Sequence, residues 1–196
     1  MSSPLYLEEP YLYVFIGALG VWIVSDLSIG VRYRDGAAAP QDEGSKRAIG
    51  IAVSGGVLGA ALVPEVVTAP GLPHPRAVFW IGIGLVLFGV LVRQYAVRTL
   101  GEFFSLTVTA EENDTVVSSG PYRWVRHPSY TGGLAALIGI GIATGNWLSL
   151  GLVTVAGLLG YGYRIRVEER VLRETLGASY EAYAERTPYR LVPGLW

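Results

Sequence analysis

Four long apolar runs constrain this chain more than any other feature of its sequence. Each is close to or longer than the roughly 20 residues that an α-helix needs to cross a bilayer. A hydrophobic share of 51% and a charged share of 16% also exclude an ordinary soluble domain. The runs span residues 11–29, 48–69, 77–97 and 131–163.

The last run is long enough for two short helices. Gly145 and Asn146 interrupt it, and such a pair predicts a tight turn. The sequence therefore predicts an all-α integral membrane protein with about five transmembrane helices, the last two forming a tight hairpin. The N-terminus lacks a basic segment and a small-residue cleavage site, so the first run is interpreted as a retained helix.

Basic residues are distributed unevenly between these runs. If the N-terminus lies outside, the inner segments hold all but one of the 15 Lys and Arg residues, and only Arg76 lies outside. This asymmetry follows the positive-inside rule. We therefore expect a protein of the cell membrane whose C-terminal segment is cytoplasmic, with residues 32–47 as a mobile cytoplasmic connector.

Several kinds of chemistry are excluded or disfavoured. The chain has no cysteine, so disulfides, thiolate catalysis and cysteine-bound metal are excluded. The two histidines, His74 and His127, fall on opposite faces of the membrane in this topology, so we expect no metal. A net charge of −1 gives no electrostatic reason to expect nucleic acid.

Two cytoplasmic segments have patterns of their own. Residues 99–119 contain two β-prone stretches around an acidic turn, which predicts a small hairpin over the cytoplasmic mouth. Residues 163–186 have the spacing of an amphipathic helix, with Glu169 and Arg173 as an i,i+4 pair. Gly177 is expected to divide this helix, and Thr187 with Pro188 to end it.

The segment 120–132 is the densest polar and aromatic cluster in the chain. It holds two prolines, two arginines, a histidine and three aromatic residues directly before an apolar run, which favours a site. Pro128 biases His127 away from helical geometry, and Ser129 and Thr131 are expected to cap the following helix. The alternative is a membrane-interface anchor made of aromatic and basic side chains.

Arg164 and Glu168 lie four residues apart where the last apolar run ends, so a helix places them on one face. They form either a snorkelling arginine with a helical salt bridge, or a pair that binds an anionic and a cationic group. Arg166 and Glu169 are expected to point elsewhere and to be structural. Because the topology places the pair level with segment 120–132, the combination suits a zwitterionic or cationic ligand.

Four motifs occur in a fixed order between about residues 92 and 193, and together they are specific. The motifs are Arg98-Thr99-Leu100-Gly101-x-Phe103-Phe104; Val117-x-x-Gly120-Pro121-Tyr122-Arg123-x-Val125-Arg126-His127-Pro128-x-Tyr130-x-Gly132; Arg164-x-x-x-Glu168-Glu169-x-x-Leu172; and Leu176-Gly177-x-x-Tyr180-x-x-Tyr183 with Thr187-Pro188. Their order and spacing resemble the isoprenylcysteine carboxyl methyltransferase family, including its prokaryotic members.

The resemblance implies one membrane methyltransferase domain, residues 1–196, that uses S-adenosyl-L-methionine at the cytoplasmic face. Residues 1–97 would form the first three transmembrane helices and the connector, and residues 98–196 the cofactor-binding catalytic half. Arg164 and Glu168 are implied as catalytic, with Arg164 also binding the substrate. A glutamine of the family is replaced by Thr107 or Thr109. The implied cofactor-binding residues are Tyr122, His127, Pro128, Ser129, Tyr130, Glu168, Asp114, Thr115, Val116 and Val117.

The implied reaction moves a methyl group from a sulfonium to a lipophilic small-molecule or prenylated acceptor that enters from the membrane. A carboxylate acceptor is already ionised at neutral pH and needs no general base. One alternative is a phospholipid N-methyltransferase, which would need Glu168 or His127 as a base. Another is a sterol- or isoprenoid-type reductase that binds NADPH, although the sequence has no clear extra basic cluster for its 2′-phosphate. A membrane scaffold without activity is the third.

Overall fold

The computed structural model describes residues 4–33, 42, 44–67, 70–104 and 116–196, and these residues are mostly helical. Short 3₁₀ helices lie at Leu5–Leu7, Gly101–Phe103 and Gly120–Arg123. The α-helices are α1 (Tyr11–Arg32), α2 (Ser45–Val66), α3 (Pro75–Leu100), α4 (Pro128–Ala143), α5 (Trp147–Leu176) and α6 (Ala178–Arg186).

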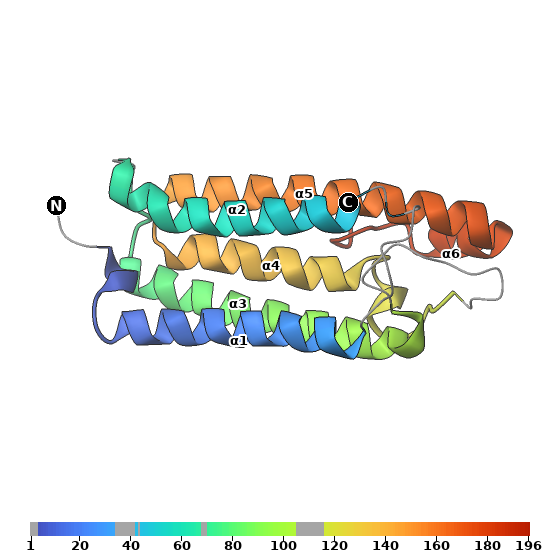
Figure 1. Cartoon of the computed structure of the whole chain (residues 1–196), viewed down its shortest axis with the longest axis horizontal. Coiled ribbons are helices and arrows are strands. Elements are labelled where there is room, and N and C mark those ends of the chain that lie inside the picture. The colour runs from blue at the N-terminus through green and yellow to red at the C-terminus, as the bar shows by residue number, and fades with distance from the viewer. Residues whose placement is uncertain (1–3, 34–41, 43, 68–69, 105–115) are drawn as a thin grey trace.

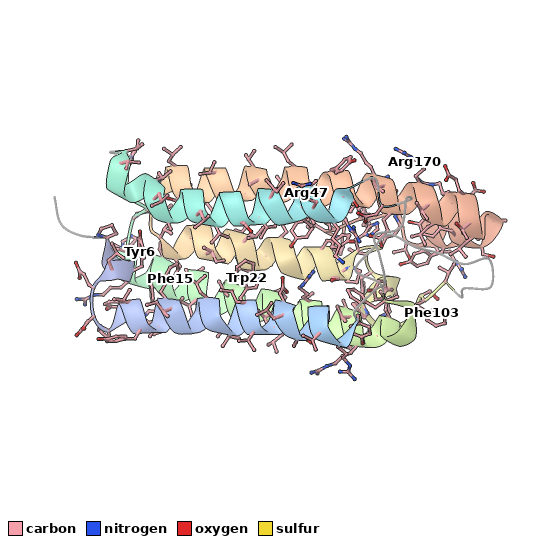
Figure 2. All side chains as sticks on the ribbon, in the orientation of Figure 1. Tyr6, Phe15, Trp22, Arg47, Phe103 and Arg170 are labelled. Atoms are coloured by element: carbon pink, nitrogen blue, oxygen red, sulfur yellow. The ribbon has the colours of Figure 1, made fainter. Side chains whose placement is uncertain are left out.

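Helices α1 to α5 form an elongated bundle in which α4 lies between two pairs, α1 with α3 and α2 with α5 (Figure 1). The chain runs back and forth, so the ends of α1, α3 and α5 meet the starts of α2 and α4. This end, which also carries α6, is called the polar end below. Arg47 and Arg170 lie toward it, whereas Tyr6 and Phe15 lie at the opposite end (Figure 2).

Among the residues that the structure describes, four helices are long and apolar enough to cross a membrane, namely α1, the Ser45–Val63 part of α2, α3 and α5. The all-helical membrane fold predicted from the sequence is confirmed, and so is the hairpin of α4 and α5 around Gly145 and Asn146. Helix α4 is shorter, with 16 residues. At 1.5 Å per residue it spans about 24 Å, less than the ~30 Å hydrocarbon core. Most of its residues are buried among the other helices.

Close backbone contacts fix where α4 begins. A Cβ atom added to Gly132 of α4 would lie 2.5 Å from the carbonyl oxygen of Gly89 in α3, so the two backbones touch. On the other side of the bundle, a Cβ on Gly56 of α2 would lie 2.8 Å from the Cβ of Ala156 in α5. Small residues at these positions allow the helices to approach each other closely.

Several helix boundaries predicted from the sequence can be compared with the structure at the polar end. Helix α2 starts at Ser45, three residues before the predicted run, so the connector is shorter than expected. Helix α5 continues to Leu176 without a break, and Gly177, with φ of 49°, separates it from α6 as predicted. The predicted hairpin within residues 99–119, including Thr107 and Thr109, lies largely outside the described residues.

Candidate functional site

The C-terminal segment holds the entry to α4 in place. The backbone N–H groups of Arg126 and His127 donate to the carbonyl oxygens of Tyr189 and Arg190, each at 2.9 Å. His127 precedes the first residue of α4, which is Pro128. Proline suits that position because the first helical N–H has no partner within the helix. The Arg-His-Pro turn is therefore fixed by the chain terminus as well as by proline.

The predicted capping of α4 by Ser129 and Thr131 is wrong. The helix starts at Pro128, so both residues lie inside its first turn, and no side chain caps it. The Thr131 hydroxyl instead donates to the carbonyl oxygen of Leu191 at 2.7 Å. The Ser129 hydroxyl accepts from Nη1 of Arg93 in α3 at 3.1 Å. Both hydroxyls therefore connect α4 to its neighbours.

Arg93 of α3 and Asp26 of α1 are charged residues that lie within apolar runs, and the structure pairs them with each other. Nε of Arg93 donates to Oδ1 of Asp26 at 2.7 Å, so charges on two membrane helices are paired. Charged groups in such segments are costly without a partner. Through its contact with Ser129, Arg93 ties α1 and α3 to the first turn of α4.

The hydroxyl group of Tyr130 bridges Arg164 and Glu168, the predicted pair on α5. Nε of Arg164 donates to the hydroxyl oxygen of Tyr130 at 3.1 Å, and that hydroxyl donates to Oε2 of Glu168. The two α5 residues thus share one face as predicted, and Tyr130 of α4 lies against that face. The Glu168 side chain is 29% exposed, so it retains access to a ligand.

His127 and Tyr130 present parallel aromatic faces beside these charges. Their ring centroids are 5.5 Å apart with an interplanar angle of 8°, and the Tyr161 ring lies 5.4 Å beyond Tyr130. Nδ1 of His127 lies 3.9 Å from Oε1 of Glu168. Its Nε2 lies 3.3 Å from Oε1 of Glu169. The imidazole therefore lies between two carboxylates that are adjacent in sequence.

Glu169 points away from the face that Arg164 and Glu168 share, as predicted, and its contacts support the predicted structural role. Its side chain is only 2% exposed and contacts Nε of Arg126 at 2.9 Å and Nη2 of Arg190 at 2.9 Å. The predicted i,i+4 partner Arg173 also contacts it, at 3.0 Å. Sequence spacing identified only Arg173, because Arg126 and Arg190 come from segments distant in sequence.

Tyr122 is anchored on both sides within the 3₁₀ helix Gly120–Arg123. Its hydroxyl donates to the carbonyl oxygen of Ala96 in α3 at 3.3 Å, and its own carbonyl accepts from the Tyr183 hydroxyl at 2.8 Å. Burial raises the pKa of the Tyr122 phenol above its ordinary value, and the nearby Glu168 charge raises this pKa further. Burial raises the pKa of Tyr183 to about 12. Both phenols are thus neutral donors at neutral pH.

Two residues before and at the start of α2 complete the surroundings of Arg164. Nη1 of Arg164 donates to Oδ1 of Asp42 at 2.5 Å and to the hydroxyl oxygen of Ser45 at 2.9 Å. Sequence reasoning missed both contacts, having treated this stretch as a connector. The available signal was an acidic residue a few positions before an apolar run, on the side of the membrane that holds Arg164.

The side chains present fit a polar ligand that carries a positive charge. Aromatic faces and the partly exposed Glu168 suit a cation. The buried Tyr180 hydroxyl has no hydrogen-bond partner among the described residues, so it offers a donor to a bound group. Within those residues, no group of three His, Cys, Asp or Glu is arranged to hold a metal. Asp114 and Thr115 lie outside the described residues, whereas Val116 and Val117 are half-buried.

Fold and site together define a class, a helical membrane protein with an aromatic and charged site at one end of its bundle. The model of the phospholipid methyltransferase family matches residues 77–179, which is more than half of the chain. The chain belongs to this family. The matched range begins within α3 and ends at the second residue of α6, so it includes the Tyr130, Arg164 and Glu168 group but omits α1, α2 and the residues from Tyr180 onward.

Named relatives agree with this membership. The chain is 30% identical over 128 residues to protein-S-isoprenylcysteine O-methyltransferase B of Arabidopsis thaliana, covering 64% of this chain and 65% of the relative. It is 36% identical over 121 residues to protein-S-isoprenylcysteine O-methyltransferase of Xenopus laevis, covering 59% and 42% respectively. The matches thus span less than two thirds of the length of these relatives.

The fold also matches a solved structure. The eukaryotic intramembrane Ras methyltransferase ICMT (isoprenylcysteine carboxyl methyltransferase) superposes with a TM-score of 0.68 at 22% sequence identity. The superposition covers 96% of this chain and 69% of that one, so it includes the N-terminal helices that the family match omits. The resemblance in fold inferred from the sequence motifs is confirmed.

Proposed function

We propose that this chain is a membrane methyltransferase that uses S-adenosyl-L-methionine and methylates a lipophilic carboxylate. One observation carries the proposal: Arg164, Tyr130 and Glu168 form a hydrogen-bonded group where α4 begins and α5 leaves the apolar part of the bundle. This group combines a cation for the acceptor, a carboxylate for a cationic ligand, and an aromatic face. The names of the relatives support the same chemistry.

The cofactor side of the site is assigned to the C-terminal half, residues 98–196. Glu168 carries the negative charge that suits a cationic ligand, and the stacked His127 and Tyr130 rings offer it aromatic faces. Tyr122, Pro128 and Ser129 are proposed as further cofactor contacts. Asp114, Thr115, Val116 and Val117 stay predicted contacts.

The acceptor side is assigned to Arg164. S-adenosyl-L-methionine supplies an electrophilic methyl group when it is bound. The chain's own task is then to strip water from an acceptor carboxylate and aim it, which the buried guanidinium of Arg164 does through charge-assisted hydrogen bonds. Tyr130 holds that guanidinium in a fixed orientation from the side of α4.

An amine acceptor requires different machinery, because an ammonium must lose a proton before it attacks. The two candidate bases already have partners: Glu168 accepts from the Tyr130 hydroxyl, and Nε2 of His127 contacts Glu169. The buried arginine also repels an ammonium. These contacts favour the carboxylate acceptor over phospholipid N-methylation.

The proposal includes an orientation in the cell membrane. With the N-terminus outside, the polar end of the bundle faces the cytoplasm, where a soluble cofactor is available. The acceptor then reaches Arg164 from the bilayer, and the cofactor arrives from water. Helices α3 and α5 extend past the first turn of α4 at the polar end (Figure 1), so that turn lies beside the longer helices and not at the tip of the molecule.

Calorimetry on the purified protein in detergent tests the cofactor class. We expect S-adenosylhomocysteine to bind and NADPH not to bind. Binding of NADPH alone would contradict the proposal and favour the reductase alternative.

A labelled methyl group identifies the acceptor chemistry. The protein is incubated with methyl-labelled S-adenosyl-L-methionine and a lipid extract, and the labelled product is treated with mild alkali. We expect alkali to release labelled methanol, because a methyl ester hydrolyses under these conditions. A label that withstands alkali and stays on a phospholipid amine would instead show N-methylation.

A further inference from the structure

The guanidinium of Arg164 contacts a carboxylate from the other half of the chain. Asp42 lies 122 residues earlier, just before α2, and its Oδ1 accepts from Nη1 of Arg164 at 2.5 Å. The Ser45 hydroxyl accepts from the same Nη1 at 2.9 Å and donates to Asp42 at 3.0 Å. The Arg164 and Asp42 side chains are 5% and 4% exposed, so this pair is shielded from water.

Asp42 is itself held by the first turn of α2. Its Oδ2 accepts from the backbone N–H of Lys46 at 3.1 Å, one of the helix-start donors that need an outside partner. Helix α2 in turn packs closely along α5, the helix that carries Arg164. The carboxylate is therefore fixed to a rigid element and does not depend on Arg164 alone for its place.

Arg164 is consequently held through both its Nη1 and its Nε. Asp42 and Ser45 hold Nη1, and Tyr130 holds Nε. A free arginine side chain has many rotamers, and fixing it costs side-chain entropy. Contacts that fix it before the acceptor arrives remove this cost from the binding step.

We propose that Asp42, with Ser45, is a positioning residue that fixes Arg164 for the acceptor. The assignment rests on the proposed function, in which Arg164 binds the acceptor carboxylate. It brings the N-terminal half into the site, since both residues lie outside the range 77–179 matched by the family. It also revises the division of labour inferred from the sequence, which gave the whole site to residues 98–196.

A competing arrangement has the acceptor carboxylate displace Asp42 from Arg164. Displacement would break the contacts of Asp42 with Ser45 and with the Lys46 N–H, leaving a helix-start donor unpaired. Asp42 therefore stays in place while the acceptor binds. The two arrangements predict opposite kinetics, because a positioning group aids turnover whereas a competitor hinders acceptor binding.

A double-mutant cycle tests the assignment by steady-state methyl transfer, with S-adenosylhomocysteine affinity and thermal unfolding measured for each variant. Asp42→Asn is expected to lower kcat about 100-fold, the size of loss that a 1 Å misplacement can cause. The affinity for S-adenosylhomocysteine is expected to change less than about twofold, since no proposed cofactor contact is touched. In an Arg164→Lys background, Asp42→Asn is expected to lower kcat less than about threefold, because the group it positions is already lost. Ser45→Ala is expected to show the same dependence with a smaller loss.

Asp26→Asn is the matched control, because Asp26 and Arg93 form another aspartate–arginine pair between helices. Its effect on kcat is expected to be the same factor with or without Arg164→Lys. An equal loss from Asp42→Asn in both backgrounds would overturn the assignment, as would a lower acceptor KM with undiminished kcat. Absence of methyl transfer by the unmutated protein would instead overturn the proposed function itself.

Discussion

Glu168 and Glu169 are adjacent in sequence yet have opposite environments. Glu168 is partly exposed and contacts the Tyr130 hydroxyl, with His127 nearby. Glu169 is almost fully buried and contacts three arginines as well as His127. Two neighbouring carboxylates on one helix therefore serve different ends, one facing the proposed ligand site and the other fastening the fold.

The difference follows from helix geometry and from what packs against each face. Successive helical residues point about 100° apart, so Glu168 faces α4 and its neighbour faces the C-terminal segment. Arg126 and Arg190 belong to the two backbone stretches that pair there. His127 lies between both carboxylates, so its ring marks the boundary between the two networks.

Among the substitutions that test the different roles of Glu168 and Glu169, removal of the Glu169 carboxylate is expected to have the largest effect, a loss of stability. Glu169→Ala leaves the buried Arg126 guanidinium without its carboxylate, and breaking such a pair costs about 3–5 kcal/mol. The expected result is a strong fall in the thermal unfolding temperature in detergent. Arg173→Ala is the matched control, because it breaks the same cluster from a side chain that is 44% exposed. We expect about 0–1 kcal/mol from it. Equal losses from both variants would contradict the fastening role.

Neutralising Glu168 tests the other side of the comparison. Glu168→Gln keeps the size of the side chain but removes its charge. Loss of one charged contact worth about 1.4 kcal/mol raises a dissociation constant about tenfold. We therefore expect S-adenosylhomocysteine affinity to fall about tenfold while the unfolding temperature stays near that of the unmutated protein. Calorimetry and thermal unfolding check this together. A large loss of stability with unchanged affinity would reverse the roles of Glu168 and Glu169.

The smallest expected effect comes from the opposite end of the bundle. Oδ1 of Asn146 accepts from the N–H groups of Leu148 and Ser149 and so caps α5. Asn146→Ala is expected to cost about 1 kcal/mol of stability, the usual loss for such a cap. Turnover per folded molecule should not change, because the residue lies far from the polar end. A clear loss of turnover per folded molecule in Asn146→Ala would show that the two ends of the bundle are coupled.

The sequence was a good guide wherever local pattern determines structure. Apolar runs, Gly145 with Asn146, and Gly177 marked the helices and their breaks. The i,i+4 spacing of Arg164 and Glu168 placed both on one face. Long-range partners could not be read in this way, because nothing in the spacing of Arg164 indicates that Asp42 meets it across the bundle.

The predicted roles of two hydroxyl groups were wrong for a related reason. Serine and threonine near a helix start are good caps in isolation, but at Ser129 and Thr131 tertiary partners took both hydroxyls. The partners of Glu169 beyond Arg173 could not be predicted from its own helix, because the segment after α6 folds back and supplies Arg190. In each case a segment far along the chain determined the contact.

The central claim is that Arg164 acts on the acceptor while Glu168 and the aromatic faces bind the cofactor. The direct test compares the unmutated protein with Arg164→Lys, using a small S-prenylated cysteine with a free carboxylate as acceptor. Lysine keeps the charge but loses the planar fork that aims a carboxylate. We expect kcat to fall about 100-fold while S-adenosylhomocysteine affinity is retained. Undiminished methyl transfer by Arg164→Lys would contradict the account.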